Sequence, residues 1–303
     1  MYKIELGTSG LNVPTVAVGC MRISDMNKKE VSAFINTAIE NGANFFDHAD
    51  IYGGGKSEAV FGDSITPSMR ENLIIQTKCG IRPGRFDFSY EHIISSVNGS
   101  LSRLGTDYID VLLLHRPDAL MEPEEVAKAF DELKASGKVR HFGVSNQNPY
   151  QMQLLQFYLD MPLCVNQLQF SIMHTPMIQA GINVNMHNDS SVNRDGSVLD
   201  FCRLNKITIQ PWSPLQFGFF EGSFIDNDKF PELNKTLENI ATKYNVSKTT
   251  VAFAWILRHP AKMQPITGTT NISRLNDCIN ACNIKLSREE WYEIYRAAGN
   301  VLP

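Results

Sequence analysis

The run Leu73-Ile-Ile-Gln-Thr-Lys78 is followed by a segment of helical period at Tyr90–Leu104 and by a second apolar run, Ile109-Asp-Val-Leu-Leu-Leu114. A further helical segment, Pro123–Ser136, leads to a third apolar run at Val139–Val144. Short apolar runs bounded by turn signals predict buried strands. Strands that alternate with segments of helix length predict βαβ units with a parallel sheet. This stretch therefore predicts an α/β fold.

The same alternation extends to both ends of the chain. The other strand-length runs are Thr15–Gly19, Asn44–Phe46, Val165–Gln169, Thr208–Trp212 and Met263–Ile266. Eight strand–helix units without a linker predict one closed (β/α)8 barrel, a TIM barrel, over residues 1–303 as a single domain. The alternative is an open doubly wound sheet, which would need a switch point and usually a glycine-rich first turn.

Two segments do not follow this alternation. Residues 2–13 predict a β-hairpin with Ser9-Gly10 at its turn, which would cap the bottom of the barrel. Residues 172–196 form a polar connection after the sixth strand and are expected to be a long loop. A loop of that length inside a compact domain is usually functional or mobile.

Composition excludes several classes of protein. The chain has 303 residues, a formal net charge of −4 and 43% hydrophobic residues, which is typical of a folded globular protein. No apolar run approaches the roughly 20 residues of a membrane span, and the charge is not that of a nucleic-acid-binding protein. The first residues show no secretory signal, and six scattered cysteines without a C-x-x-C pair suggest reduced thiols. We expect a cytoplasmic protein.

Polar side chains cluster where the predicted strands end. In barrels of this kind, active sites lie at the carboxyl ends of the strands. The residues at these ends are Asp47 to Tyr52 after the second strand, Lys78 after the third, His115 after the fourth, Ser145 and Asn146 after the fifth, Asn166 and Gln167 after the sixth, Trp212 and Ser213 after the seventh, and Gly268, Thr269 and Thr270 after the eighth.

Four of these residues can act together on a carbonyl group. A lysine at the barrel mouth, Lys78, needs an anionic partner, and Asp47 on the adjacent strand can provide one. An ammonium beside Tyr52 is expected to lower the pKa of its phenol from about 10 toward neutrality, which would make Tyr52 a general acid. A neutral His115 could orient the carbonyl oxygen. The set suits carbonyl reduction with hydride from a cofactor.

Other motifs do not support a different chemistry. Gly53-Gly-Gly-Lys-Ser57 resembles part of a P-loop, but Asp50 stands where that motif requires glycine. Asp47, His48, Asp50 and His115 could be read as the metal site of a barrel hydrolase, but no H-x-H occurs at the first strand and Lys78 stands beside them. Cys278 and Cys282 lack further ligands for zinc. No metal site is predicted.

Four segments resemble the aldo-keto reductase family, in the family's order: Asn44–Gly54, Gln76–Lys78, Leu112–Pro117 and Gly137–Asn146. The run Asp47–Gly54 and the segment Asp118–Glu122 are most similar to a bacterial branch of predicted oxidoreductases. The resemblance implies a TIM barrel that reduces an aldehyde or ketone with NADPH. It implies Tyr52 as the proton donor, Asp47 and Lys78 as the pair that tunes it, and His115 as the group that orients the carbonyl.

The resemblance also implies a nicotinamide dinucleotide bound in extended form across the barrel mouth. The implied contacts are Met21, Arg22, Ser145, Asn146, Gln167, Trp212, Ser213, Leu215, Gly268, Thr269, Thr270, Arg274 and Asp277. Among them, Ser145, Asn146 and Gln167 would hold the carboxamide, and Trp212 would stack on the nicotinamide. Arg274 would grip a 2′-phosphate, although Gly268 replaces a lysine that many members carry there, so NAD is a possible alternative cofactor.

A second function remains open at this point. A nucleotide-binding redox sensor or regulatory subunit of the same fold, with little turnover, would also carry these residues. The partner expected in either case is a small molecule, either a carbonyl substrate or the nucleotide, and neither nucleic acid nor a membrane is expected.

Overall fold

The computed structural model describes residues 1–303, and its central feature is a sheet of eight parallel strands. Their order in the sheet is β11-β10-β9-β8-β5-β4-β3-β12. The strands are β3 (Ala17–Gly19), β4 (Phe45–Asp47), β5 (Ile74–Cys79), β8 (Ile109–Leu114), β9 (Val139–Ser145), β10 (Leu163–Gln169), β11 (Thr208–Trp212) and β12 (Ile266–Thr267). The two edge strands of the sheet, β11 and β12, lie close together. The backbone N–H of Gln264, just before β12, donates a hydrogen bond of 3.0 Å to the carbonyl of Ile209 in β11. The predicted (β/α)8 barrel is confirmed.

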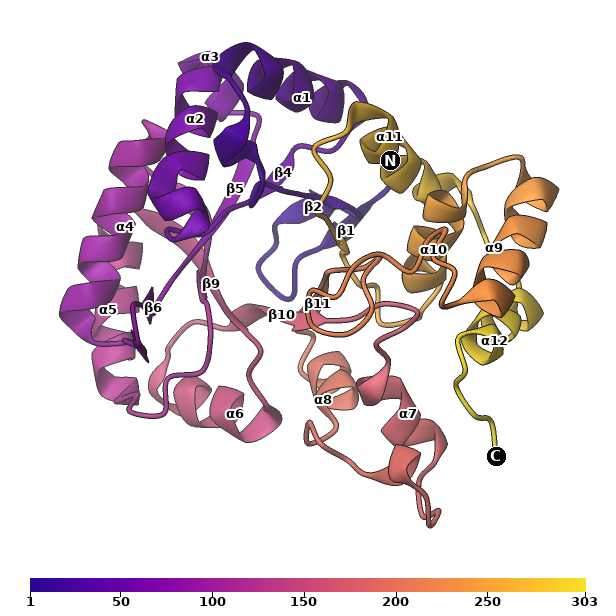
Figure 1. Ribbon diagram of the computed structural model, residues 1–303. Coiled ribbons are helices and arrows are strands. Elements are labelled where there is room, and N and C mark those ends of the chain that lie inside the picture. The colour runs from indigo at the N-terminus through magenta and orange to yellow at the C-terminus, as the bar shows by residue number, and fades with distance from the viewer.

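Helices surround the strands, as Figure 1 shows. Their bounds are α1 (Lys28–Glu40), α2 (Lys56–Ser64), α3 (Pro67–Arg70), α4 (Tyr90–Leu104), α5 (Pro123–Ala135), α6 (Pro149–Tyr158), α8 (Val198–Leu204), α9 (Pro231–Tyr244), α10 (Lys248–Leu257), α11 (Ile272–Asn280) and α12 (Arg288–Ala297). Local sequence fixes several helix ends. The side chain of Ser89 accepts from the His92 amide at the start of α4, and Gly105 ends that helix with φ 62°.

The N-terminal hairpin forms as predicted. Strands β1 (Lys3–Glu5) and β2 (Asn12–Pro14) pair antiparallel and bury Leu6 and Val13 at the bottom of the barrel. Gly7 has φ +59°, and a Cβ there would lie 2.6 Å from the Cys164 carbonyl oxygen, so the close approach of the turn to β10 requires glycine. A small antiparallel pair, β6 (Ile81–Arg82) with β7 (Arg85–Phe86), follows β5.

The connection over residues 172–196 is not wholly a loop, and that expectation is wrong in part. Pro176 begins helix α7 (Pro176–Ile182), and a 3-10 turn covers Asp189–Ser191. Met177 and Ile178 of α7 are buried against the main core. This burial stabilises a short helix that the polar residues on either side of it do not predict. Figure 1 shows α7 and the following segment projecting from the barrel.

The largest core cluster lies between the sheet and the helices. Phe130 of α5 stacks on Phe142 of β9 with ring centroids 4.1 Å apart. Trp255 and Trp291 stack at 4.7 Å, and each indole N–H donates to the other residue's carbonyl. No helix combines the length and the apolar character needed to cross a bilayer.

Candidate active site

A buried ion pair lies at the carboxyl end of β4 and β5. The Lys78 ammonium donates to Asp47 Oδ2 at 2.9 Å and to the His48 carbonyl at 2.6 Å. The Lys78 side chain is fully buried and that of Asp47 is 4% exposed. Burial acts to lower the pKa of Lys78, but Asp47 and Tyr52 outweigh burial and raise it, so the ammonium stays charged.

Tyr52 completes the coordination of this ammonium. Its hydroxyl oxygen accepts from Lys78 Nζ at 3.1 Å. Tyr52 begins a 3-10 turn, Tyr52–Gly55, in which Gly53 and Gly54 have positive φ. A Cβ on Gly53 would lie 2.5 Å from Ser24, so this turn between β4 and α2 needs glycine there.

The expected fall in the Tyr52 pKa is wrong for the structure described. Burial raises the pKa of Tyr52 above its ordinary value of 10, and the Lys78 ammonium only partly opposes this. The reason is that removal from water disfavours the phenolate more than one charge–charge contact favours it. The phenol therefore stays protonated near neutral pH, which is the form that a proton donor requires.

His115 stands directly after β8 and faces Tyr52. The two rings meet edge to face with centroids 5.9 Å apart. Burial, together with the charges of Lys78 and Arg116, lowers the pKa of His115 well below 6.5, so the imidazole is neutral. Its Nδ1 is buried and has no hydrogen-bond partner.

Four buried glutamines support Asp47 from inside the barrel. Gln76 and Gln167 donate to Asp47 Oδ1 at 2.6 and 3.2 Å. Gln210 exchanges two hydrogen bonds with Gln76, at 2.8 and 3.1 Å. Gln210 also donates to Gln264, which in turn donates to the Pro14 carbonyl of the N-terminal hairpin. A hydrogen-bonded chain thus joins the site to the bottom of the barrel.

The His48 side chain lies beside the site and makes no hydrogen bond. Its ring meets Phe61 edge to face at 4.5 Å, and neither ring nitrogen has a partner. Burial, with a smaller effect of Lys78, lowers its pKa from 6.5 to about 3. The structure therefore leaves His48 a neutral packing group.

Replacing His48 with Leu should make the protein less sensitive to acid. Between pH 6.5 and about 3 the unfolded chain binds a proton that the folded chain excludes, so stability is lost as pH falls. The resulting loss in the free energy of unfolding is about 2 kcal/mol at about pH 5. Urea unfolding of H48L at about pH 7 and about pH 5 should show that loss reduced, with the exposed His187→Gln as control. An equal loss in H48L and wild type would contradict the assignment.

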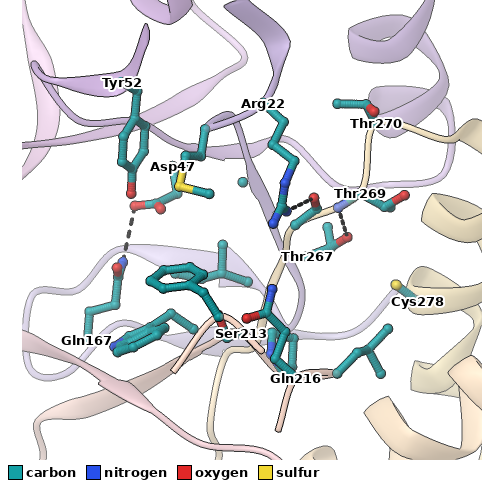
Figure 2. Close-up of a pocket in the computed structure, with 18 of the residues that line it drawn as sticks. Arg22, Asp47, Tyr52, Gln167, Ser213, Gln216, Thr267, Thr269, Thr270 and Cys278 are labelled. Carbon is teal, nitrogen blue, oxygen red and sulfur yellow. Dashed lines mark hydrogen bonds between the residues drawn. The ribbon is translucent and has the colours of Figure 1, made fainter. Parts of the chain in front are cut away.

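A cavity of about 580 Å³ opens over these groups. Its wall includes Asp47, Tyr52 and His115, whereas Lys78 lies buried behind it. Figure 2 shows Tyr52, Asp47 and Gln167 at one end and Thr269, Thr270 and Cys278 toward the other. The wall also contains Met21, Arg22, Ser145, Asn146, Gln167, Trp212, Ser213, Leu215, Gly268, Thr269, Thr270 and Arg274.

One expected cofactor contact lies outside this wall. Asp277 is in α11 beyond the cavity, and its carbonyl accepts from the Thr250 hydroxyl. Asp277 lies on the same helix between Arg274 and Cys278, which both line the cavity. Cys278 lines the cavity, whereas Cys282 shares a hydrogen bond of 3.0 Å with the Thr15 hydroxyl. No three His, Cys, Asp or Glu side chains lie close enough together to hold a metal ion.

The residues expected around the nicotinamide carboxamide form hydrogen bonds with their neighbours in the structure. Asn146 accepts from the Trp212 indole N–H at 3.2 Å and donates to the Ser145 hydroxyl at 2.8 Å. Asn146 and Ser213 have φ values of 56° and 52°, unusual for residues other than glycine, and such strain concentrates at functional sites. Phe220 packs roughly parallel to the Trp212 indole with centroids 5.9 Å apart.

The far end of the cavity is bounded by the loops after β3 and β12. Arg22 donates to the Gly268 carbonyl at 2.6 Å and so joins the two loops. Asn271 caps α11 by accepting from the Arg274 amide, which places Arg274 in the first helical turn. Arg274 makes no ion pair, so its guanidinium and the positive end of the helix are both available to an anion.

Sequence reasoning missed several residues of the site. Gln76, Gln210 and Gln264 support Asp47, and Gln216 lines the cavity with a buried Oε1 that has no donor. A signal for Gln76 and Gln210 was present, because each interrupts an otherwise apolar strand run. The partner of each could not be read from spacing.

Comparison with known proteins gives the family. The model of the aldo/keto reductase family matches residues 4–298. The chain belongs to the aldo/keto reductase family. This aldo/keto reductase is 37% identical to the uncharacterized oxidoreductase YcsN of Bacillus subtilis (strain 168), over 98% of both chains. It is 35% identical to a 6-dehydroglucose reductase of Agrobacterium fabrum, again over 98% of both.

A solved structure agrees with the fold of this aldo/keto reductase. The thermostable aldo-keto reductase Tm1743, in complex with the inhibitor epalrestat, superposes with a TM-score of 0.80. It is 27% identical, and the match covers 98% of this chain and 100% of that one.

Proposed function

We propose that the protein reduces the carbonyl group of an aldehyde or ketone to an alcohol, with NADPH as hydride source and Tyr52 as proton donor. The observation that carries the proposal is the Tyr52 hydroxyl, held 3.1 Å from a buried Lys78 ammonium on the wall of the cavity. A reductase from Agrobacterium fabrum among the relatives is named for action on 6-dehydroglucose, which fits carbonyl chemistry.

The residues of the cavity fit a nicotinamide dinucleotide. A volume of about 580 Å³ is in the range of cofactor pockets, about 300–1,000 Å³. Gln216 offers a buried, unpartnered oxygen, and Gln167 donates both amide hydrogens to Asp47 and Gln210, which leaves its own oxygen free. When bound, the cofactor would supply a hydride to the carbonyl carbon.

The chain's own residues would manage the charge on the carbonyl oxygen. As that oxygen becomes negative, Tyr52 would donate its proton to it. The Lys78 ammonium stabilises the phenolate that remains, and Asp47 keeps Lys78 charged. Neutral His115 can donate one ring N–H to the same oxygen, because its pKa lies well below 6.5.

Preference for NADPH over NADH would rest on Arg274 at the start of α11. A guanidinium can bind a phosphate through two hydrogen bonds, and the helix end adds a favourable dipole. We expect R274S to weaken NADPH affinity by about 10-fold or more while leaving NADH affinity nearly unchanged.

Fluorescence titration of the wild type and R274S with each nucleotide tests this expectation, because Trp212 lines the cavity. Trp212→Phe identifies the reporter among the three tryptophans. Consumption of NADPH with a panel of aldehydes and ketones then tests the reaction. If neither nucleotide bound the wild type, the proposed function would be wrong.

A further inference from the structure

A second cavity, which we call the side chamber, adjoins the catalytic cavity. It has a volume of about 430 Å³ and shares Arg116, Asn146 and Trp212 with the first. The rest of its wall comes from the loop after β9, the end of β10, Phe219 and the segment from residue 174 to residue 198. The long connection after β10 therefore forms one side of a chamber that opens beside the catalytic groups.

The side chamber carries two arginines without acidic partners. Neither Arg116 nor Arg194 makes an ion pair. The one carboxylate in the wall, Asp195, accepts instead from the backbone amides of Ser197 and Val198. The wall thus carries two guanidinium groups against one carboxylate, and an anionic group would complement the excess positive charge.

Arg116 is held at the junction of the two cavities. Its guanidinium carbon lies 5.5 Å from the centre of the Trp212 ring and 6.0 Å from that of Phe219. These are contacts with aromatic rings, and Arg116 makes no ion pair, so its N–H donors remain free for oxygen atoms. Arg116 directly follows His115 in the chain, so a substrate that extends from the reacting carbonyl into the chamber passes it.

The wall also offers partners for hydroxyl groups. Gln147 is 2% exposed, and its Oε1 is buried with no donor. An unpartnered buried acceptor is costly, and a ligand hydroxyl would satisfy it. Asn148 and Gln151 use their side-chain oxygens to cap α6, which leaves their amide N–H groups as donors. A hydroxyl group both donates and accepts hydrogen bonds, so a wall that offers acceptors and donors suits it.

We propose that the side chamber binds the distal part of the substrate, and that this part carries hydroxyl groups and a negatively charged oxygen-rich group such as a carboxylate or a phosphate ester. The inference rests on the proposed function, since it extends the same site. The reacting carbonyl lies at Tyr52 and His115, and the anionic end lies against Arg116 and Arg194.

Paired substrates test the proposal. Succinic semialdehyde and butanal differ in a terminal carboxylate, and glyceraldehyde 3-phosphate and glyceraldehyde differ in a phosphate. We expect the wild type to favour the anionic member of at least one pair by about 10-fold or more in kcat/KM. R116Q and R194Q should each reduce that preference mainly through KM. Arg288→Gln, an exposed arginine of α12, should leave it unchanged.

The role of Gln147 is tested by comparing glyceraldehyde, which has hydroxyl groups, with butanal, which has none. Q147L should lower kcat/KM for glyceraldehyde while leaving that for butanal nearly unchanged, because only glyceraldehyde has a hydroxyl for Oε1. A preference within the carboxylate pair alone, or within the phosphate pair alone, would support the proposal and identify the anion.

The outcomes separate the two proposals. Turnover of all four aldehydes without preference, unaffected by R116Q and R194Q, would overturn the side chamber and leave the reductase function intact. Failure of NADPH to bind at all would instead overturn the reductase function.

Discussion

Y52F should lower kcat for carbonyl reduction by about 10²–10⁴-fold, the usual contribution of a general acid. The substitution removes the hydroxyl that lies 3.1 Å from Lys78 and keeps the ring that meets His115. Because the phenol is on the cavity wall and the ring remains, nucleotide affinity should change little. Single-turnover reduction and fluorescence titration measure the two quantities separately.

The control for this variant is an exposed tyrosine. Tyr150 lies on α6 with 80% of its surface exposed, and Y150F should keep wild-type kcat. Retention of kcat in Y52F would assign the proton to another donor, of which His115 is the nearest candidate on the wall. Loss of nucleotide binding together with kcat would point to a structural effect instead.

Removing Lys78 should cost both stability and activity. K78M leaves the Asp47 carboxylate buried with only amide donors from Gln76 and Gln167. Loss of one partner of a buried ion pair typically destabilises a protein by about 3–5 kcal/mol. Reduction should also slow strongly, because no ammonium would stabilise the phenolate of Tyr52. Denaturant unfolding and steady-state kinetics measure the two losses.

A double variant separates these effects. Asp47→Asn combined with K78M removes both charges, so it should regain most of the stability that K78M loses while remaining inactive. Arg203→Met provides a matched control on the surface, where Arg203 lies 3.7 Å from Asp200 of the same helix. Its cost should stay within about 1 kcal/mol. If the double variant were no more stable than K78M, the buried pair would not explain the loss.

Much of the candidate site could be predicted because each residue lies at a strand end. Parallel strands in a barrel carry their carboxyl ends to one face, so Asp47, Lys78 and His115 had to approach one another once the strands were recognised. Tyr52 follows five residues later in a glycine-rich turn that can only fold close to the end of β4. Local spacing was therefore enough to bring these groups together.

The pKa of Tyr52 could not be predicted in the same way. Spacing indicated the ammonium beside it, and the structure contains that contact. The depth of burial, which raises the pKa, depends on the packing of several elements around the ring.

The sequence by itself determined the alternation of strands and helices, the hairpin and the identity of the residues at the strand ends. Each of these follows from periodicity or from capping and turn residues within a few positions along the chain. Only the tertiary structure decided the glutamine chain beneath Asp47, the burial of α7 and the side chamber. The bonds from Gln167 to Asp47 and from Gln210 to Gln76 span 120 and 134 residues. Such contacts depend on barrel closure and register, which no local pattern encodes.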